Sequence, residues 1–324
     1  MKMQYNQIPV VMICDENFAM HTCVALTSLK MNKKESTCYE VYVMAADCSE
    51  KAIKKLQEQK GKNFNVHIIQ TSVKEYEIVK QVTHISIAGL LKFDICNLLP
   101  QYEKILYLDG DIIIREDLWD LYSTDIGDNY VACVVHSLGI ISSEMKMNSG
   151  VMLLNATKIR DENTRDVLVK TRVELGERKS MDQETFQIVF GEKKKFVHPR
   201  YNIMMDKVEY EKKYYSIKEF NKFYGTNYKN SKEIVDTAAI IHFTGAIKPW
   251  KYKFAKGFKE WYFYYQIAFG GQENLVLKGK IQYLQEEFKK NGVRGLYWLL
   301  KDKILIFIGE YFGLYLDKSH GEWN

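Results

Sequence analysis

The first half of the chain alternates short apolar runs with segments of helical periodicity. The runs are rich in β-branched and aliphatic residues, as buried strands are, and lie at residues 8–15, 39–47, 65–71 and 104–114. Helical patterns lie between them, at residues 18–32, 49–63 and 84–100. This alternation predicts right-handed β-α-β units and a mainly parallel sheet with helices on its faces.

Two carboxylates interrupt the apolar run of residues 104–114. Asp109 and Asp111 form a D-x-D motif, and strand periodicity predicts that both point to one face of a single strand. Like charges beside a core are unfavourable unless a cation compensates them, and carboxylates are ligands of Mg²⁺ and Mn²⁺. Gly110 is expected to let the backbone bend and a ligand approach. A turn with two solvated acids is the alternative that the motif alone leaves open.

Asp15 and Asp109 both stand at the carboxyl ends of predicted strands. Open parallel sheets bind their ligands at these ends, so the two acids are expected to share one cleft. The chain has no G-x-G-x-x-G after a strand and no G-x-x-x-x-G-K-[ST]. The simplest dinucleotide-binding and P-loop functions are therefore excluded.

A second segment, DTAAIIHFTGAIKPWKY, suggests what the acids bind. It places His242 at the end of an apolar strand, followed by Gly245 and Lys248. Imidazole is a ligand for Mn²⁺, while a glycine and a lysine suit a phosphate. Taken alone, His242 is better explained as a core histidine. Together with the carboxylate pair, the segment predicts a divalent cation bound to a diphosphate.

Composition narrows the class of protein. The chain has 324 residues, of which 46% are hydrophobic and 27% charged, and it is therefore expected to be globular. Its net charge of +5 is too small to predict a nucleic-acid partner. The six cysteines include no C-x-x-C pair and are expected to be reduced thiols in a cytosolic protein.

Six segments together carry a resemblance to a known family. They are ICDENF, HISI with KFDICNLLPQYEKILYLDGDIII, MNSGVMLLN, DQETF, PRYNIM and HFTGAIKPW, and they span about residues 8–252 in the family's order. The chain resembles glycosyltransferase family eight, which comprises retaining enzymes that use UDP-sugars. The likeness is greatest to the bacterial lipopolysaccharide α-galactosyl- and α-glucosyltransferases.

The resemblance implies roles for residues that their local sequence alone does not assign. Asp15 would accept a hydrogen bond from the uracil, Asn17 would make a second base contact, and Phe18 would stack on the ring where a tyrosine is common. Lys92 stands where the family usually has an arginine that contacts the donor sugar and diphosphate. A lysine keeps the charge but loses the bidentate fork.

Three further residues are assigned to the sugar by the same resemblance. Asn148 would bind the sugar hydroxyls, Asp182 would contact the donor hexose, and Gln183 would lie near the anomeric carbon. Locally, a turn before a strand explains Asn148 equally well, and a helix N-terminus explains Asp182.

The implied reaction moves galactose or glucose from UDP-galactose or UDP-glucose to an acceptor hydroxyl, with retention at the anomeric carbon. Asp109, Asp111 and His242 would hold Mn²⁺ or Mg²⁺, while Gly245 and Lys248 would stabilise the leaving diphosphate. The acceptor would be a glycan or a lipid-linked saccharide in the synthesis of lipopolysaccharide or another surface polysaccharide. The sequence leaves the donor sugar and the linkage open.

The resemblance also implies an α/β fold of GT-A type, in which helices flank a single Rossmann-type, mainly parallel sheet. Residues 1–252 are predicted to form the nucleotide-sugar-binding catalytic domain, and residues 253–324 an aromatic and basic helical C-terminal region. That region suits an anionic membrane surface, but a cap on the catalytic domain or a dimer contact explains it equally well. The enzyme is expected in the cytoplasm, with attachment to the inner face of the membrane left open.

Two other functions are compatible with parts of the sequence. One is a non-catalytic protein of the same fold that binds nucleotide sugars or glycans, which the presence of all three predicted metal ligands disfavours. The other is a phosphatase of the haloacid dehalogenase type, which needs a threonine soon after its D-x-D motif. Ile112 and Ile113 stand there instead.

Overall fold

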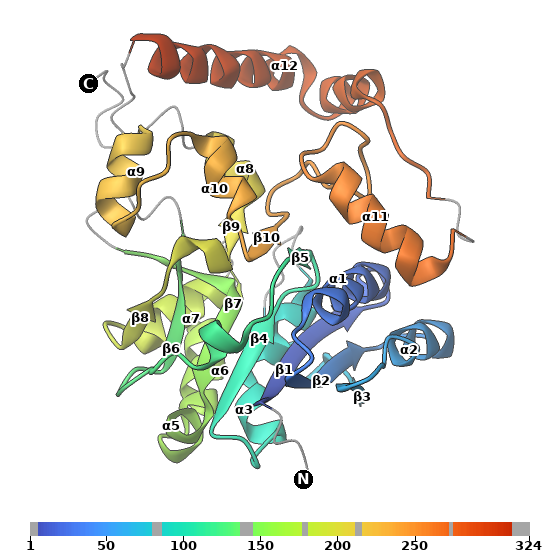
Figure 1. The fold of residues 1–324 in the computed structure, drawn as a ribbon, viewed down its shortest axis with the longest axis vertical. Helices are drawn as coiled ribbons and strands as arrows, with labels where there is room; N and C mark the ends of the chain where they lie inside the picture. The colour runs from blue at the N-terminus through green and yellow to red at the C-terminus, as the bar shows by residue number, and fades with distance from the viewer. Residues whose placement is uncertain are drawn as a thin grey trace. The chain divides into compact units, whose positions relative to one another are not determined.

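The computed structural model describes residues 6–79, 86–136, 145–176, 181–210, 216–271 and 275–312 (Figure 1). The chain forms two compact units. Unit 1 comprises Met1–Val135 and Met147–Val197, and unit 2 comprises His136–Lys146 and His198–Asn324. The functional division after residue 252 stays a prediction. His84 and Ile85 of the HISI segment, and residues 313–324, lie outside the described residues.

Unit 1 is built on a sheet that, within the described residues, has seven strands in the order β3-β2-β1-β4-β7-β6-β8. The β1-β2, β2-β3, β1-β4 and β6-β8 pairs are parallel, while β7 runs antiparallel to β4 and β6. The predicted mainly parallel sheet is therefore confirmed. The strands are β1 (Asn6–Asp15), β2 (Thr37–Ala46), β3 (Phe64–Thr71), β4 (Lys104–Leu108), β6 (Val131–Val135), β7 (Met147–Asn155) and β8 (Lys194–Phe196).

Helices connect and flank these strands (Figure 1). Ser49 caps α2 as its position predicts, because its hydroxyl accepts a hydrogen bond from Ala52 N at 3.2 Å. The helices are α1 (Ala19–Asn32), α2 (Glu50–Gln57), α3 (Ile95–Leu98), α4 (Trp119–Tyr122), α5 (Ala156–Asp161), α6 (Thr164–Leu175) and α7 (Asp182–Phe190), with 3₁₀ helices η1 (Lys74–Tyr76) and η2 (Ile87–Phe93).

The prediction of one strand over residues 104–114 is wrong. β4 ends at Leu108, and β5 (Ile112–Ile114) is a separate strand outside the seven-stranded sheet. Helix α1 holds β5, since Ile114 N donates to Ser28 Oγ at 3.0 Å and Asn32 Nδ2 donates to Ile114 O at 2.9 Å. Both halves are apolar because both are buried, so the pattern could not separate them.

The helix predicted over residues 84–100 is, in its described part, the 3₁₀ helix η2 followed by the four-residue α3. Asp94 separates them, and its carboxylate accepts from Tyr76 Oη at 2.7 Å and Arg165 Nε at 2.9 Å. These tertiary partners favour a break that the local pattern does not reveal.

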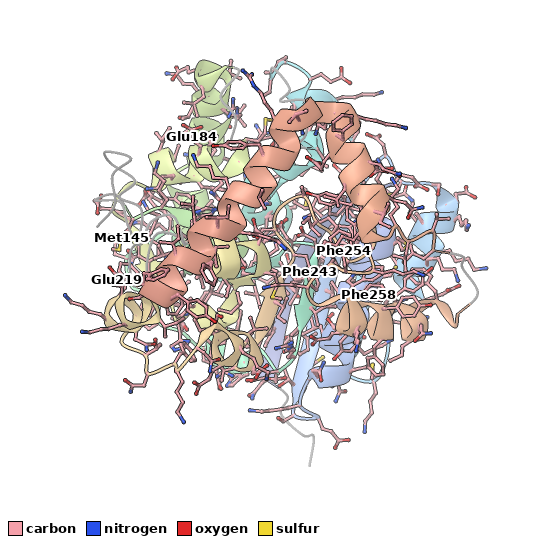
Figure 2. All side chains as sticks on the ribbon, turned by 90° about the horizontal axis from the view of Figure 1, so that it is seen from above. Met145, Glu184, Glu219, Phe243, Phe254 and Phe258 are labelled. Atoms are coloured by element: carbon pink, nitrogen blue, oxygen red, sulfur yellow. The ribbon has the colours of Figure 1, made fainter. Side chains whose placement is uncertain are left out.

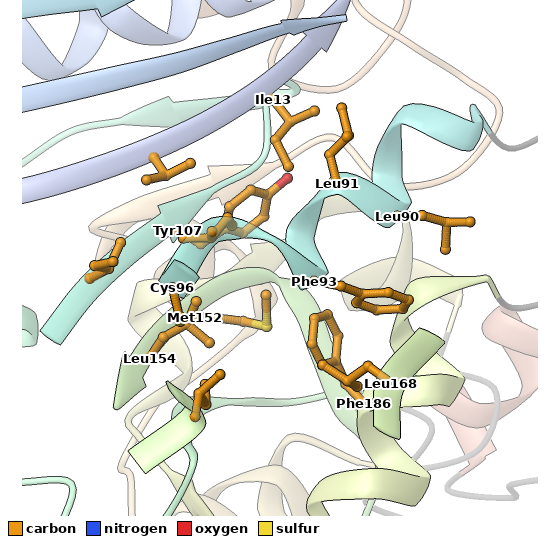
Figure 3. Close-up of a cluster of buried hydrophobic side chains, with 14 of the residues drawn as sticks. Ile13, Leu90, Leu91, Phe93, Cys96, Tyr107, Met152, Leu154, Leu168 and Phe186 are labelled. Carbon is orange, nitrogen blue, oxygen red and sulfur yellow. The ribbon is translucent and has the colours of Figure 1, made fainter. Parts of the chain in front are cut away.

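The core of unit 1 lies where η2, α6 and α7 pack on β4 and β7 (Figure 3). Phe93 of η2 meets Phe186 of α7 edge to face, with ring centroids 5.2 Å apart. Because its neighbours in η2, Leu91 and Phe93, are buried in this core, Lys92 is carried inward with them and is only 7% exposed.

Unit 2 contains a parallel pair of short strands and several helices. Ser216 and Glu219 form a reciprocal capping box at the start of α9. Phe243 and Phe258, labelled in Figure 2, lie near Gly257, where a Cβ would stand 2.6 Å from the Phe243 ring. The elements are η4 (Pro199–Tyr201), β9 (Ile203–Met204), α8 (Met205–Tyr210), α9 (Ile217–Tyr224), α10 (Ser231–Asp236), β10 (Ile240–His242), α11 (Phe258–Phe269) and α12 (Lys280–Phe312).

Helix α12 contacts α8 and is bent at Gly292, whose φ of 59° and ψ of −153° are not helical (Figure 1). In the described part of the chain, no helix has an apolar stretch long enough to cross a lipid bilayer.

Candidate functional site

Asp15 and Asp109 lie at the carboxyl ends of neighbouring strands, as predicted. Asp15 is the last residue of β1, Asp109 follows β4, and β1 and β4 are parallel neighbours. The Asp15 carboxylate accepts from Phe18 N at 3.0 Å and from Ser86 Oγ at 2.8 Å. Asn17 is exposed and Phe18 is half-buried, so both are accessible at this edge.

Gly110 lies against helix α1, so contacts within the protein limit the side chain at this position. Its φ is not in the left-handed region, so no special backbone conformation demands a glycine. A Cβ at this position would instead stand 2.7 Å from Thr22 Oγ1 and 3.6 Å from Phe18 Cδ1. Helix α1 therefore leaves little room for a side chain at position 110, and the close approach of a ligand stays a prediction.

The ammonium of Lys92 lies between two carboxylates. Lys92 Nζ is 2.7 Å from Asp182 Oδ2 and 3.2 Å from Asp109 Oδ1, and it also donates to Ser149 O at 3.3 Å. Ser149 Oγ donates to Asp182 Oδ2 at 2.8 Å, and Tyr107 Oη donates to Asp109 Oδ1 at 2.6 Å. One buried network therefore joins η2, β4, β7 and α7.

The charges in this network stabilise one another. Burial by itself lowers the pKa of Lys92, but Asp109 and Asp182 outweigh it and raise that pKa above its ordinary value. Burial likewise opposes ionisation of Asp182, yet the Lys92 ammonium and the Ser149 hydroxyl lower its pKa below the usual range. Burial, followed by the charge of Asp109, raises the pKa of Tyr107, so its hydroxyl keeps its proton.

Asn148 and Gln183 meet beside this network. Gln183 Oε1 accepts from Asn148 Nδ2 at 3.1 Å and from Ser149 N at 3.3 Å. Asn148 Oδ1 in turn accepts from Gly150 N at 2.9 Å. These bonds bring the two predicted sugar-binding amides side by side and fix their orientation.

His242 ends β10 in unit 2 and is buried. Its Nδ1 lies 2.9 Å from Asn202 Oδ1. With the oxygen of Asn202 as acceptor, Nδ1 carries the proton and Nε2 keeps its lone pair. A hydrogen bond on the far ring nitrogen is the usual support of a metal-binding histidine.

Gly245 and Lys248 lie on the loop after β10. Gly245 has a φ of +84°, and a Cβ there would stand 2.7 Å from Asp206 Oδ2, so only glycine fits. The ammonium of Lys248 donates to Phe243 O and lies 5.3 Å from the centroid of the Trp250 ring. The loop therefore has a defined shape set by contacts within unit 2.

Within unit 1 the structure brings most of the predicted site residues together. The sequence interpretation gave no supporting hydrogen bond to Ser86, Tyr107 and Ser149, nor to Asn202 of unit 2. Of these, Tyr107 had a sequence signal, because it precedes Asp109 by two residues and would share its face in the predicted strand.

Solved glycosyltransferases share this fold. The galactosyltransferase LgtC, solved with donor and acceptor sugar analogs, superposes with a TM-score of 0.68 at 22% identity, over 80% of this chain and 96% of LgtC. The GT-A-like fold is thereby confirmed. The chain belongs to glycosyltransferase family 8, whose sequence profile, described as "Glycosyl transferase family 8", matches residues 9–253.

Curated relatives agree with this assignment. General stress protein A of Bacillus subtilis is 22% identical over 273 residues, which are 79% of this chain and 92% of the relative. Lipopolysaccharide 1,2-glucosyltransferase of Escherichia coli is 24% identical over 257 residues, 73% of this chain and 71% of the relative. Glycosyltransferase GlyB of Streptococcus pneumoniae is 28% identical over 248 residues, 74% of this chain and 57% of the relative. The predicted family is confirmed.

Replacing Lys92 should strongly destabilise the fold. Lys92→Met leaves Asp182 buried without its cation, which should lower the free energy of unfolding by about 3–5 kcal/mol in urea denaturation. Lys104→Met is the matched control, because the Lys104 ammonium donates to two carbonyls, Tyr122 O and Thr124 O, and should cost about 1 kcal/mol. Equal losses in both variants would contradict this interpretation.

The contact at Gly110 predicts a rescue. Gly110→Ala should lower the free energy of unfolding by about 1–3 kcal/mol, because its Cβ clashes with Thr22 Oγ1. Thr22→Ala removes that atom, so the double variant should be more stable than the sum of the two single losses allows. A double-mutant cycle in urea measures this coupling. Simple additivity would show that the clash is not the cause.

Proposed function

We propose that the protein is a retaining, metal-dependent glycosyltransferase that moves galactose or glucose from a UDP-sugar to a hydroxyl of a glycan or glycolipid. The observation that carries the proposal is the buried network at the sheet edge, where Lys92 links Asp109 of the D-x-D motif to Asp182. Such a network positions charge at the site where a nucleotide diphosphate would leave a sugar. The proposed pathway is synthesis of lipopolysaccharide or another surface polysaccharide.

Asp109, Asp111 and His242 are proposed to hold Mn²⁺ or Mg²⁺. Two carboxylates and an imidazole are a donor set that Mn²⁺ accepts, and the Nδ1 contact with Asn202 leaves Nε2 as the donor atom. The residues therefore fit the ion. When bound, the ion would neutralise charge on the departing diphosphate.

The protein's own residues are proposed to bind the rest of the donor. Asp15 and Asn17 would hydrogen-bond the uracil, and Phe18 would stack on it. The Gly245 backbone and the Lys248 ammonium would stabilise the diphosphate, since the glycine lets the backbone approach and the lysine supplies a point charge.

The hexose would be held by the network itself. The Asp182 carboxylate would accept hydrogen bonds from its hydroxyls, and Lys92 keeps Asp182 ionised. The Asn148 amide would also bind these hydroxyls. Gln183 would line the β-face near the anomeric carbon, where its amide is held by Asn148 and Ser149. An amide is a poor nucleophile, so we favour front-face attack by the acceptor. A trapped glycosylated side chain that turns over would contradict this mechanism.

The enzyme proposal predicts metal-dependent release of UDP. With a panel of UDP-sugars, turnover should occur with UDP-galactose or UDP-glucose in Mn²⁺ and stop in EDTA. Asp111→Ala should reduce turnover at least about 100-fold while leaving the unfolding transition unchanged. Asp166→Ala, which removes an exposed carboxylate of α6, is the matched control and should retain full activity.

Binding without turnover distinguishes the alternative function. Thermal shift measures binding of UDP-sugars, and the UDP-release assay measures turnover. If the protein binds UDP-sugars but releases no UDP with any of the acceptors tested, it is the non-catalytic binder. Absence of binding to every UDP-sugar would overturn both functions.

Helix α12 is proposed to bind an anionic membrane surface, which places a cytoplasmic enzyme at the inner face of the membrane. Exposed apolar side chains recur every three or four residues along its second half, while Leu305 is buried. This spacing lines one face of a helix, and Arg294, Lys301 and Lys303 are interleaved with it. The exposed residues are Val293, Tyr297, Leu300, Ile304, Phe307 and Tyr311.

Vesicle sedimentation tests the membrane proposal. The full chain should sediment with phosphatidylglycerol vesicles and less with phosphatidylcholine, since both apolar burial and charge contribute. Leu300→Glu with Phe307→Glu should abolish binding. The matched control, Val167→Glu with Val173→Glu, changes exposed apolar residues of α6 and should bind normally. Equal sedimentation of both double variants would refute a role for this face.

A further inference from the structure

Tyr107 is a buried tyrosine whose hydroxyl donates to Asp109 Oδ1 at 2.6 Å. We propose that Tyr107 is a positioning residue that fixes the Asp109 carboxylate for binding the divalent cation. This inference rests on the proposed function, because it assumes that Asp109 is a metal ligand. Tyr107 is neither a proposed metal ligand nor one of the residues proposed to contact the UDP-sugar.

The ring of Tyr107 is held rigidly. Tyr107 is the next-to-last residue of β4, and its backbone lies between two strands, paired with Val11 of β1 and Met152 of β7. The side chain is 2% exposed, and Figure 3 shows it near Ile13 and Leu91, with its hydroxyl at the edge of the apolar cluster. A donor fixed in this way can orient the group it contacts.

Two donors act on the same carboxylate oxygen. Lys92 Nζ lies 3.2 Å from Asp109 Oδ1, the atom that Tyr107 Oη also contacts, and the ammonium is 4.8 Å from the centroid of the Tyr107 ring. Together they resist rotation of the carboxylate about its Cβ–Cγ bond. The second oxygen, Oδ2, is then kept in one direction.

The Tyr107 hydroxyl matters because Lys92 divides its hydrogen bonds among several acceptors and holds the Asp109 carboxylate less closely. Lys92 is closer to Asp182, at 2.7 Å, and shares its remaining donors with Ser149 O. Without the Tyr107 hydroxyl, the Asp109 carboxylate loses the shorter of the two contacts to Oδ1. A metal ligand that has to be ordered on binding gives a weaker site.

Removing the hydroxyl tests the inference directly. Binding of Mn²⁺ to the full chain in the presence of UDP, followed by electron paramagnetic resonance of free Mn²⁺, should be about tenfold weaker in Tyr107→Phe. The Mn²⁺ concentration that half-activates UDP release should rise by a similar factor. The rate at saturating Mn²⁺ should change less than about twofold, since the ligands themselves remain.

Tyr76→Phe is the matched control. Tyr76 is also buried, and its hydroxyl donates to Asp94 Oδ2 at 2.7 Å, a carboxylate that is paired with Arg165. Both variants remove a tyrosine-to-aspartate hydrogen bond beside a cation, so both should lower the thermal unfolding temperature comparably. Only Tyr107→Phe should weaken Mn²⁺ binding.

The outcomes separate this inference from the proposed function. No Mn²⁺ binding by the unaltered protein with UDP would overturn the metal site itself. Normal binding by the unaltered protein and by Tyr107→Phe would overturn only the positioning role. Equal weakening in Tyr107→Phe and Tyr76→Phe would also overturn it, because the effect would then reflect general stability.

Discussion

The site depends on one buried ammonium. Lys92 is almost fully removed from water, which is costly unless its charge is compensated. Asp109 and Asp182 supply the compensation, and the buried charge of Asp182 would in turn be costly without Lys92. The charges of Lys92 and Asp182 therefore depend on each other. This mutual dependence ties η2 to α7, although Lys92 and Asp182 are separated by 90 residues.

A lysine suits this position better than the fork of an arginine would. Its three donors reach Asp182, Asp109 and Ser149 O, which come from three different elements. The guanidinium of an arginine prefers two parallel bonds to one carboxylate. The departure from the usual family residue thus exchanges a bidentate contact for a link between the two carboxylates. This link couples the proposed metal ligand to the proposed sugar ligand.

The sequence predicted the elements whose pattern is local. Strands β1 to β3 and helices α1 and α2 were found because apolar period and capping residues, such as Ser49, agree there. The break between β4 and β5 was missed because Leu108 and Ile112 are both buried, and Gly110 has no unusual φ to mark a turn. Burial against different partners leaves the same signature in the sequence.

The site was predictable only as far as its motifs. The resemblance selected Asp182, and the segment around residues 236–252 selected His242, but their supporting contacts depend on which strands become neighbours. His242 meets Asn202, 40 residues earlier in the chain, because β10 pairs in parallel with β9, and this pairing carries no local signal.

The two proposed metal ligands, Asp109 and His242, are supported in the same way. Asp109 receives the hydroxyl of Tyr107 from its own strand, and His242 receives the amide oxygen of Asn202 from the segment that leads into β9. In each case the partner is buried and comes from the same unit as the ligand. Each of these side chains is therefore oriented by contacts that form when its own unit folds. The entropy of ordering both side chains is then lost in folding, and binding of a cation does not have to include it.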